Sequence, residues 1–371
     1  MKVMRTGQLA GLVVVGALAL TGCGSDNNTA TPKATGAPST GSSSSAIACA
    51  KGDLKGAGST FQKNIVAQWI KDYTAPCTGA RVDYQGIGSG AGIKQFGSGT
   101  IDFAGSDSTM KPDEQSAADA RCGSPAIHLP VTAGGIAIAY NLKGVKDLQL
   151  SPKTIAGIFQ GTITKWDNKA IKSDNPGATL PSTAITAVHR DDSSGTTSVV
   201  SKFLTATAAA DWKLGEGKEL KWPATVKGAA KSDGVTQAVA GTDGGVTYVE
   251  TSFVESGGLQ AAKVKNGAGE YTALDTQTVT TALGGATLPD SGNDLQVKYD
   301  FANTTAGAYP ITAVSYEIVC TKAKDAAKQA LLKSFLTYAV GTGQDSAAAA
   351  GFAPLPAALV DKVKTSIAAL S

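Results

Sequence analysis

Residues 53–87 read DLKGAGSTFQKNIVAQWIKDYTAPCTGARVDYQGI, and this stretch predicts the fold class. It opens with a short strand pattern at 53–57, continues with apolar residues at helical spacing over 61–73, and ends in a second strand pattern at 80–87. A strand, a helix and a strand in succession are typical of two parallel strands joined by a crossover helix. The side chains expected to face the core from this helix are Ile65, Trp69 and Ile70.

The same alternation continues along the rest of the chain. Further strands are predicted at 101–106, 126–141, 184–190, 244–250 and 309–320. Further helices are predicted at 92–97 and 325–340. This pattern indicates an α/β fold with mainly parallel sheets flanked by helices. A folded part of about 325 residues is too long for one core, so two lobes are expected.

The N-terminal residues have the features of a targeting segment. A basic start precedes an apolar stretch at 9–20, whose 12 residues are too few to span a bilayer but suit a signal peptide. The next residues, LTGC (20–23), resemble a bacterial lipobox. We therefore expect a signal peptide over 1–22 and lipidation at Cys23, with acyl chains such as palmitate holding the protein at the membrane. An ordinary secretory signal with a chance cysteine is the alternative.

The segment after Cys23 differs in composition from the rest. Residues 25–45 contain no bulky apolar side chain, so a flexible stalk is expected over 23–50. Removal of the signal peptide takes away Lys2 and Arg5 and leaves 31 basic and 30 acidic residues, a net charge of +1. A nearly neutral chain lacks the excess positive charge that is typical of nucleic-acid-binding proteins, so no nucleic-acid partner is expected.

The five cysteines favour disulfides over a metal site. If Cys23 is lipidated, an even number remains, which is typical of disulfides in an oxidising compartment. Three pairings are possible. Cys49 and Cys77 each precede a predicted strand by a few residues, so adjacent parallel strands would bring them together and leave Cys122 to pair with Cys320. No two of these cysteines lie within four residues of each other, which fits no zinc pattern, and no metal or cofactor is expected.

One local pattern occurs three times, as GAGSTFQKN (56–64), GIGSGAGIK (86–94) and DDSSGTTSVV (191–200). Each is a strand end followed by Gly, Ser and Thr and then by a helix start. The free N–H groups and positive partial charge of a helix start, together with hydroxyl donors, bind anions. A single loop of this kind is more often an ordinary cap or turn. GIGSGAG does not keep the spacing of a dinucleotide-binding loop, so that alternative is rejected. Three such loops predict an anion site.

The stretch HRDDSSGTTS (189–198) raises the alternative of a hydrolase. His189 and Arg190 are neighbours in a predicted strand, so their side chains point to opposite faces. If Arg190 faces the cleft, His189 faces away from it. His128 lies in an apolar strand, which is typical of a packed core histidine, and the chain contains no GxSxG nucleophile motif. The stretch therefore predicts an anion site and not a catalytic triad.

Six motifs span almost the whole chain after the signal peptide: GAGSTF (56–61), VDYQGIGSGAGI (82–93), IDFAGSD (101–107), FQGTITKWD (159–167), HRDDSSGTT (189–197) and YPITAVSYEIV (309–319). Their joint occurrence in this order closely resembles the phosphate-binding lipoproteins of the bacterial phosphate ABC importer, the PstS family. The resemblance implies a two-lobed type II periplasmic-binding fold with the ligand in the interlobe cleft. It also implies that lobe I comprises 51–132 and 309–371 and that lobe II comprises 133–308.

The resemblance implies a ligand set for phosphate: Thr60, Phe61, Ser89, Asp107, Arg190, Ser194, Gly195 and Thr196. Asp192 would orient the guanidinium of Arg190. Taken alone, Asp107 is more typical of a helix cap, but within this family it would accept the proton that phosphate carries. Sulfate has no such proton near neutral pH, so the carboxylate would favour phosphate over sulfate.

The resemblance further implies a monomeric extracytoplasmic substrate-binding protein on the outer face of the cell membrane. It would capture inorganic phosphate and deliver it to the transmembrane subunits of an ABC permease, without being an enzyme. A binding protein for another oxyanion, or a surface sensor or adhesin, is the alternative. A phosphatase is less favoured because the sequence offers no metal-ligand cluster, no usable histidine base and no free cysteine.

Overall fold

The computed structural model describes residues 47–289 and 291–371, and Ala46–Ser371 form one compact unit. The predicted signal peptide, Cys23 and the stalk up to residue 46 lie outside the described residues. Within the described part of the chain, no helix is both long and apolar enough to cross a membrane.

The main sheet has the strand order β2-β1-β3-β12-β4-β8-β6-β7, with β9 added beside β4. Its strands are β1 (Gly52–Gly58), β2 (Ala80–Gly86), β3 (Phe103–Ser106), β4 (Ala126–Asn141), β6 (Thr186–Arg190), β7 (Lys227–Ala229), β8 (Gly245–Glu250), β9 (Gln260–Ala261) and β12 (Thr312–Cys320). A small second sheet contains β5 (Gln149–Leu150), β10 (Lys263–Lys265) and β11 (Tyr271–Thr272).

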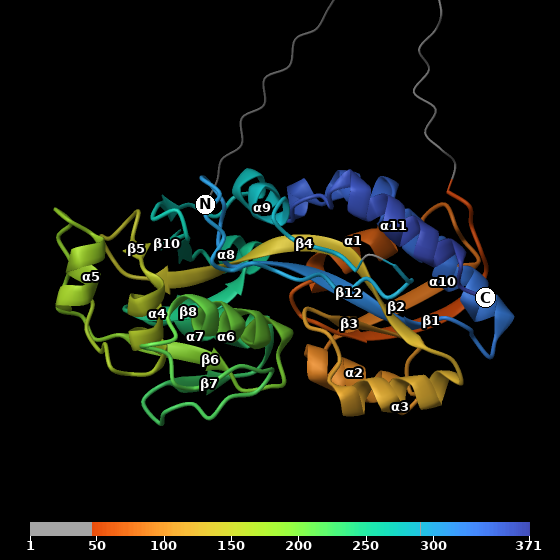
Figure 1. Ribbon diagram of the computed structural model, residues 1–371, viewed down its shortest axis with the longest axis horizontal. Helices are drawn as coiled ribbons and strands as arrows, with labels where there is room; N and C mark the ends of the chain where they lie inside the picture. Colours follow the sequence, from red (N-terminus) through yellow and green to blue (C-terminus); the bar gives the residue numbers. More distant parts are fainter. Residues whose placement is uncertain (1–46, 290) are drawn as a thin grey trace, which may run out of the picture. The chain divides into compact units, whose positions relative to one another are not determined.

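Strand direction differs from the expectation in the middle of the sheet. The outer groups β2-β1-β3 and β8-β6-β7 are parallel, as predicted. By contrast, β12 runs antiparallel to both β3 and β4, and β4 runs antiparallel to β8. Figure 1 shows β4 and β12 passing lengthwise through the centre of the molecule. These two strands therefore connect the two parallel groups.

Strand β4 changes partner along its length. Ala126–Gly135 pair with β12, and Ile136–Asn141 pair with β8. Gly134 and Gly135 lie at this change, where a Cβ atom on Gly135 would come within 2.2 Å of Leu274 Cδ1. The double glycine thus allows other elements to pack directly on the β4 backbone.

Helices cover both faces of the sheet: α1 (Lys63–Thr74), α2 (Ser89–Gly97), α3 (Pro112–Cys122), α4 (Pro152–Phe159), α5 (Lys169–Asp174), α6 (Gly195–Thr207), α7 (Lys231–Ala240), α8 (Thr251–Ser256), α9 (Thr276–Leu283), α10 (Ala326–Ala339) and α11 (Ala357–Ala368). Two 3₁₀ helices, Thr342–Ser346 and Ala348–Ala350, follow α10. Successive side chains of β1 point to opposite faces. Leu54 accordingly packs in the core that contains α1 and α10, and Ala57 packs in the core that contains α2 and α3.

Helix α1 buries Ile65, Val66, Trp69 and Tyr73, while Ile70 is only half-buried. The observed inward face of α1 is therefore rotated slightly from the predicted one.

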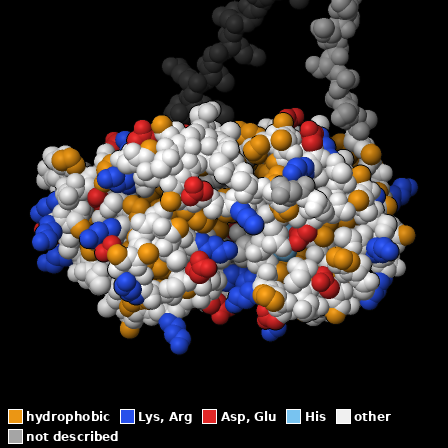
Figure 2. All heavy atoms as spheres, viewed as in Figure 1, with side chains coloured by type: hydrophobic (Ala, Val, Ile, Leu, Met, Phe, Trp, Pro, Cys, Tyr) orange, Lys and Arg blue, Asp and Glu red, His pale blue; other side chains and the backbone are white. Residues whose placement is uncertain are grey.

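Both predicted disulfides form: Cys49 pairs with Cys77, and Cys122 pairs with Cys320. Acidic and basic side chains are interspersed over the face drawn in Figure 2, as the small net charge suggests.

Candidate anion-binding site

The three Gly, Ser and Thr loops meet at one place. The loop after β1 precedes α1, Ser89 is the first residue of α2, and Ser194 caps α6 by accepting the Thr197 N–H at 3.2 Å. The first two loops are joined because Gly88 N–H donates to Gly58 O at 2.8 Å. The second and third are joined because Gly90 N–H donates to Ser193 O at 3.0 Å. The predicted helix starts thus converge on one another.

Asp107 lies at the end of β3 and is 3% exposed. Its Oδ1 atom accepts the hydroxyls of Ser59 and Ser315, each at 2.6 Å, and its Oδ2 atom lies 3.5 Å from Ser89 Oγ. It caps no helix, because Lys111 is the N-cap of the following helix α3. The carboxylate therefore faces the loops, with one oxygen satisfied and the other able to accept a further donor.

Burial raises the pKa of Asp107 above its ordinary value. The hydroxyls of Ser315 and Ser59, and after them the positive charge of Arg190, oppose this rise. A buried carboxylate with a raised pKa is a stronger hydrogen-bond acceptor than an exposed one. Such a group suits an anion that itself carries a proton.

Gly195 brings the start of α6 against Asp107. A Cβ atom at this position would lie 2.4 Å from Ser89 Oγ and 2.7 Å from Asp107 Oδ2. Any side chain would displace one of these groups, so the close approach requires glycine. The backbone N–H groups of the first turn of α6 consequently start beside the carboxylate.

Arg190 is the cation of the site. It lies at the end of β6, is 3% exposed and is held at two points, by Nε to Asp192 Oδ1 at 2.6 Å and by Nη2 to Asp192 Oδ2 at 2.5 Å. Burial raises the pKa of Asp192, but the hydrogen bonds and charge of Arg190 outweigh burial and leave that pKa below its ordinary value. The two-point pair fixes the guanidinium plane and leaves Nη1 directed toward Ser232 Oγ at 3.4 Å.

Thr60 and Thr196 supply further hydroxyls. Thr60 Oγ1 lies 2.7 Å from Ser232 Oγ, at the start of α7. Thr196 is 2% exposed, and its Oγ1 atom has no hydrogen-bond partner in the described residues. An unpaired buried hydroxyl costs about 1–3 kcal/mol, which a bound anion would recover.

Three residues of this region were not singled out from the sequence. Ser59 accepts the Phe61 N–H at 3.0 Å and donates to Asp107, so the predicted Phe61 donor already has a partner. Ser232 links Thr60 to Arg190, and Ser315 reaches Asp107 from β12. Ser232 belongs to KSDG at a helix start, a weak form of the predicted pattern, whereas Ser59 stands inside GAGSTF itself.

The two histidines have structural roles. His189 stacks on Trp222 with ring centroids 4.7 Å apart, and its Nδ1 atom lies 2.7 Å from Arg190 O. His128 is fully buried, accepts the Met110 N–H at Nε2 and lies 2.8 Å from Asp294 through Nδ1. Neither is paired with a serine among the described residues. Across residues 47–289 and 291–371, no group of three or more His, Cys, Asp or Glu could hold a metal ion.

A second layer lies behind Asp107. Gln62 Nε2 donates to Glu317 Oε1 at 2.9 Å and to Tyr84 Oη at 3.1 Å, and Tyr84 Oη donates to Ser59 O at 2.9 Å. Burial raises the pKa of Glu317 well above its ordinary value. A neutral Glu317 would leave Asp107 as the carboxylate that faces the loops.

Contacts also join elements on either side of the site. Lys218 Nζ pairs with Glu114 Oε2 at 2.6 Å, and the Lys218 side chain is only 5% exposed. The Lys218 carbonyl accepts the Ser194 N–H at 2.9 Å. On another side, Lys63 pairs with Asp233 at 3.0 Å between two more exposed side chains. The Lys218 pair thus connects the α6 loop to the start of α3.

A family model described as the PBP superfamily domain matches residues 42–342. The chain is 38% identical over 375 residues to phosphate-binding protein PstS 3 of Mycobacterium tuberculosis, and the match covers 100% of both chains. It is 34% identical over 316 residues to phosphate-binding protein PstS of Xylella fastidiosa, with 84% of each chain covered.

Solved structures match the fold. A high-affinity periplasmic phosphate-binding protein with bound phosphate superposes with a TM-score of 0.70 at 24% identity, covering 85% of this chain and 93% of that one. A phosphate-binding protein from Stenotrophomonas maltophilia gives a TM-score of 0.69 at 24% identity, covering 85% and 94%. At these identities the likeness is one of fold: the two-lobed α/β architecture predicted from the sequence.

Proposed function

The chain belongs to the PBP superfamily and, within it, to the PstS phosphate-binding proteins, and on this premise we propose that it captures inorganic phosphate outside the cytoplasm. The observation that best supports this function is the convergence of Arg190, Asp107 and three helix starts in one buried place. Arg190 supplies the charge, the helix starts supply N–H donors, and Asp107 supplies an acceptor.

We assign the phosphate ligands to Thr60, Phe61, Ser89, Asp107, Arg190, Ser194, Gly195 and Thr196, with Asp192 orienting Arg190. In this assignment hydroxyl and backbone donors bind the unprotonated phosphate oxygens, and the Phe61 N–H exchanges its hydrogen bond to Ser59 Oγ for one to phosphate. The Asp107 Oδ2 atom accepts the hydrogen bond from the protonated oxygen. The unpaired Thr196 hydroxyl and the free acceptor capacity of Asp107 support the assignment.

Capture would follow from closure of two lobes around the anion. We assign lobe I to 51–132 and 309–371 and lobe II to 133–308, with the crossings in β4 and near the start of β12. The change of partner along β4 supports this division. A ligand that contacts both lobes stabilises the closed state by its differential affinity for it.

We also infer delivery of the phosphate to an ABC permease, by a monomer that is lipidated at Cys23 and held at the outer face of the cell membrane. The LTGC motif supports the anchor, and the likeness to PstS proteins supports the transport role. We infer that the protein binds phosphate without catalysing a reaction. The proposed ligands form an anion site and include no nucleophile paired with a base.

Calorimetric titration of the purified protein, first stripped of bound phosphate, tests the proposal. We expect one-to-one phosphate binding and no response to sulfate at the same concentration. Binding of sulfate with equal affinity would favour a general oxyanion-binding protein. No detectable binding of phosphate would contradict the proposed function, and hydrolysis of a chromogenic phosphate ester would indicate a phosphatase.

A further inference from the structure

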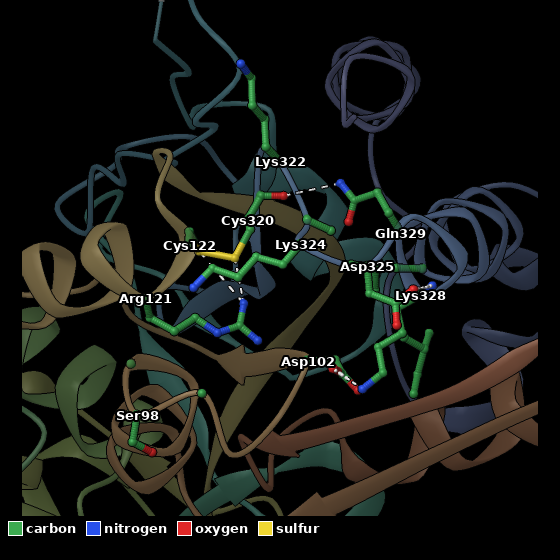
Figure 3. A pocket seen from close by; sticks show the side chains of 15 residues that line it. Ser98, Asp102, Arg121, Cys122, Cys320, Lys322, Lys324, Asp325, Lys328 and Gln329 are labelled. Atoms are coloured by element: carbon green, nitrogen blue, oxygen red, sulfur yellow. Dashed lines mark hydrogen bonds and ion pairs between the residues drawn. A yellow bond between two sulfur atoms is a disulfide. The ribbon is translucent and has the colours of Figure 1, made fainter.

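A pocket of about 520 Å³ lies beside the Cys122–Cys320 disulfide, and none of the proposed phosphate ligands lines it. Its walls come from the end of α3, the segment after β12 and the first turn of α10 (Figure 3). Leu54 and Leu332 add apolar surface. A volume between about 300 and 1,000 Å³ is typical of sites for small organic molecules and exceeds the needs of an inorganic anion.

Arg121 is the half-buried cation of this pocket. Its guanidinium lies 4.7 Å from the Phe96 ring centroid, and its Nη2 atom donates to Ile101 O at 2.9 Å. Its Nη1 atom is directed at Cys320 Sγ, 2.6 Å away. These partners are all uncharged and occupy only part of the five donors of a guanidinium. Burial lowers the pKa of Arg121, and the negative charge of nearby Asp102 opposes this shift.

The acidic residues of the pocket are already engaged. Asp102 pairs with Lys328 Nζ at 2.8 Å and accepts the Lys55 N–H at 2.9 Å. Asp325 caps α10 by accepting the N–H groups of Ala327 and Lys328. Neither carboxylate forms a direct ion pair with Arg121 in the described part of the chain, although the charge of Asp102 acts on it.

Two further lysines increase the positive charge. Lys322 and Lys324 line the pocket and form no ion pair within the described part of the chain. In Figure 3, Lys324 extends across the disulfide toward Arg121, whereas Lys322 points outward. Arg121 and Lys324 thus present two unpaired cations to the same space.

We propose that this pocket binds a small organic phosphate monoester, with the phosphate group between Arg121 and Lys324 and the apolar body against Leu54 and Leu332. The guanidinium has N–H groups beyond those directed at Ile101 O and Cys320 Sγ that can donate to phosphate oxygens, and the ammonium group adds a second charge. Two cations match the double negative charge of a monoester, whereas a carboxylate would balance only one. The pocket is separate from the proposed inorganic-phosphate site, so both can be occupied together.

The test is a calorimetric titration with phenyl phosphate of protein that is saturated with inorganic phosphate. A one-to-one binding event is expected. Arg121→Gln should weaken it by at least about tenfold, the value of one charge-assisted hydrogen bond, and Lys324→Gln should weaken it several-fold. Lys143→Gln, at an exposed lysine outside the pocket, is the matched control and should leave it unchanged. No binding of phenyl phosphate, or unchanged binding by Arg121→Gln, would overturn the proposal.

Two controls separate this proposal from folding effects and from the proposed function. Arg121→Lys keeps the charge and should bind with intermediate affinity, and all variants should keep the circular dichroism spectrum and inorganic-phosphate affinity of the parent. Sedimentation with phosphatidylcholine vesicles, with and without phosphatidic acid, distinguishes a lipid headgroup from a free monoester. If the protein binds phenyl phosphate but not inorganic phosphate, the proposed function is contradicted and the proposal for this pocket stands.

Discussion

Asp107 is the residue that should decide which anion the site accepts. Its Oδ1 atom takes hydrogen bonds from Ser59 and Ser315, so Oδ2 is the atom left for the ligand. Phosphate near neutral pH keeps a proton that Oδ2 can accept. Sulfate would place an oxygen acceptor against this oxygen, and two buried acceptors facing each other are destabilising.

Asp107→Asn is expected to reduce the ratio of phosphate to sulfate affinity by about 100-fold or more, because the amide can donate where the carboxylate can only accept. Calorimetry with each anion measures the ratio. Asp53→Asn, at an exposed carboxylate that lies 3.6 Å from Arg81, is the matched control and should leave it unchanged. An unaltered ratio in Asp107→Asn would remove this residue from the recognition of the anion.

Gly195→Ala should abolish phosphate binding while leaving the protein folded. The added methyl group would collide with Ser89 Oγ and Asp107 Oδ2, so α6 could no longer approach the carboxylate. We expect a loss of affinity of about 100-fold or more, since displacing a reacting or binding group by about 1 Å has effects of this size. Thermal melting with and without phosphate reads out both folding and binding.

The control for this substitution is Gly234→Ala inside α7. A Cβ atom there meets its nearest neighbours at 3.7 Å, an ordinary contact distance. Alanine is also the better helix former. Gly234→Ala should keep full phosphate binding with equal or higher thermal stability. If Gly195→Ala kept the parent affinity, the close approach of α6 would be irrelevant to the site.

At the scale of elements, the Lys218–Glu114 pair connects the α6 loop to α3. The Lys218 side chain is almost fully buried, and its carbonyl holds the N–H of Ser194, a proposed ligand. Burial lowers the pKa of Lys218, and the hydrogen bond that Lys218 donates to Glu114 opposes that shift. A nearly buried pair that joins two elements around the site should hold them together once the ligand has bound.

Lys218→Met retains the apolar stem but removes the charge, so Glu114 loses its partner. We expect phosphate to dissociate about tenfold faster, with a smaller change in the association rate. Stopped-flow release of phosphate measures this. Lys63→Met breaks the more exposed pair with Asp233 and should change dissociation less than about threefold. Equal effects of the two substitutions would show that burial of the pair is unimportant.

Elements that depend on local signals could be predicted from the sequence. The Gly, Ser and Thr loops precede helices because these residues suit turns and helix starts, and the long apolar run at 126–141 forms the buried strand β4. Ser232 and Ser315 could not be predicted, because tertiary pairing brings them to the site. Ser315 reaches Asp107 only because β12 runs antiparallel beside β3, which no local pattern indicates.

At the scale of the whole molecule, the α/β class follows from the alternation of periods along the chain. The antiparallel middle of the sheet does not, since a buried strand reads as a continuous apolar run in either direction. The disulfide pairing was predictable for a related reason. Cys49 and Cys77 stand in equivalent places before β1 and β2, which are parallel neighbours.

The compact unit also buries several acids, and burial is the largest influence on the pKa of each. Burial raises the pKa of Asp107, of Glu317 and of Glu250, the last to about 8. Glu250 is 1% exposed, caps α8 and accepts the Ser252 hydroxyl at 2.7 Å. Like-charged Asp107 and Glu255 add to its rise. With a pKa of about 8, Glu250 keeps in the folded protein a proton that the unfolded chain has already released at neutral pH.

This difference has a definite sign. Between the ordinary carboxyl pKa of 4.5 and about 8, the folded state binds the Glu250 proton and the unfolded state does not, so the free energy of unfolding falls as pH rises through this window. Glu250→Gln cannot ionise and should flatten the profile by up to about 1.4 kcal/mol per pH unit. Urea denaturation without phosphate, in steps from about pH 5 to 8, measures it. Glu216→Gln, at an exposed carboxylate outside this helix, is the control and should retain the parent slope. If the free energy of unfolding of Glu250→Gln depended on pH as that of the parent does, Glu250 would be ionised in the folded protein despite its burial. The hydrogen bonds from Ser252 would then be sufficient to stabilise the charge.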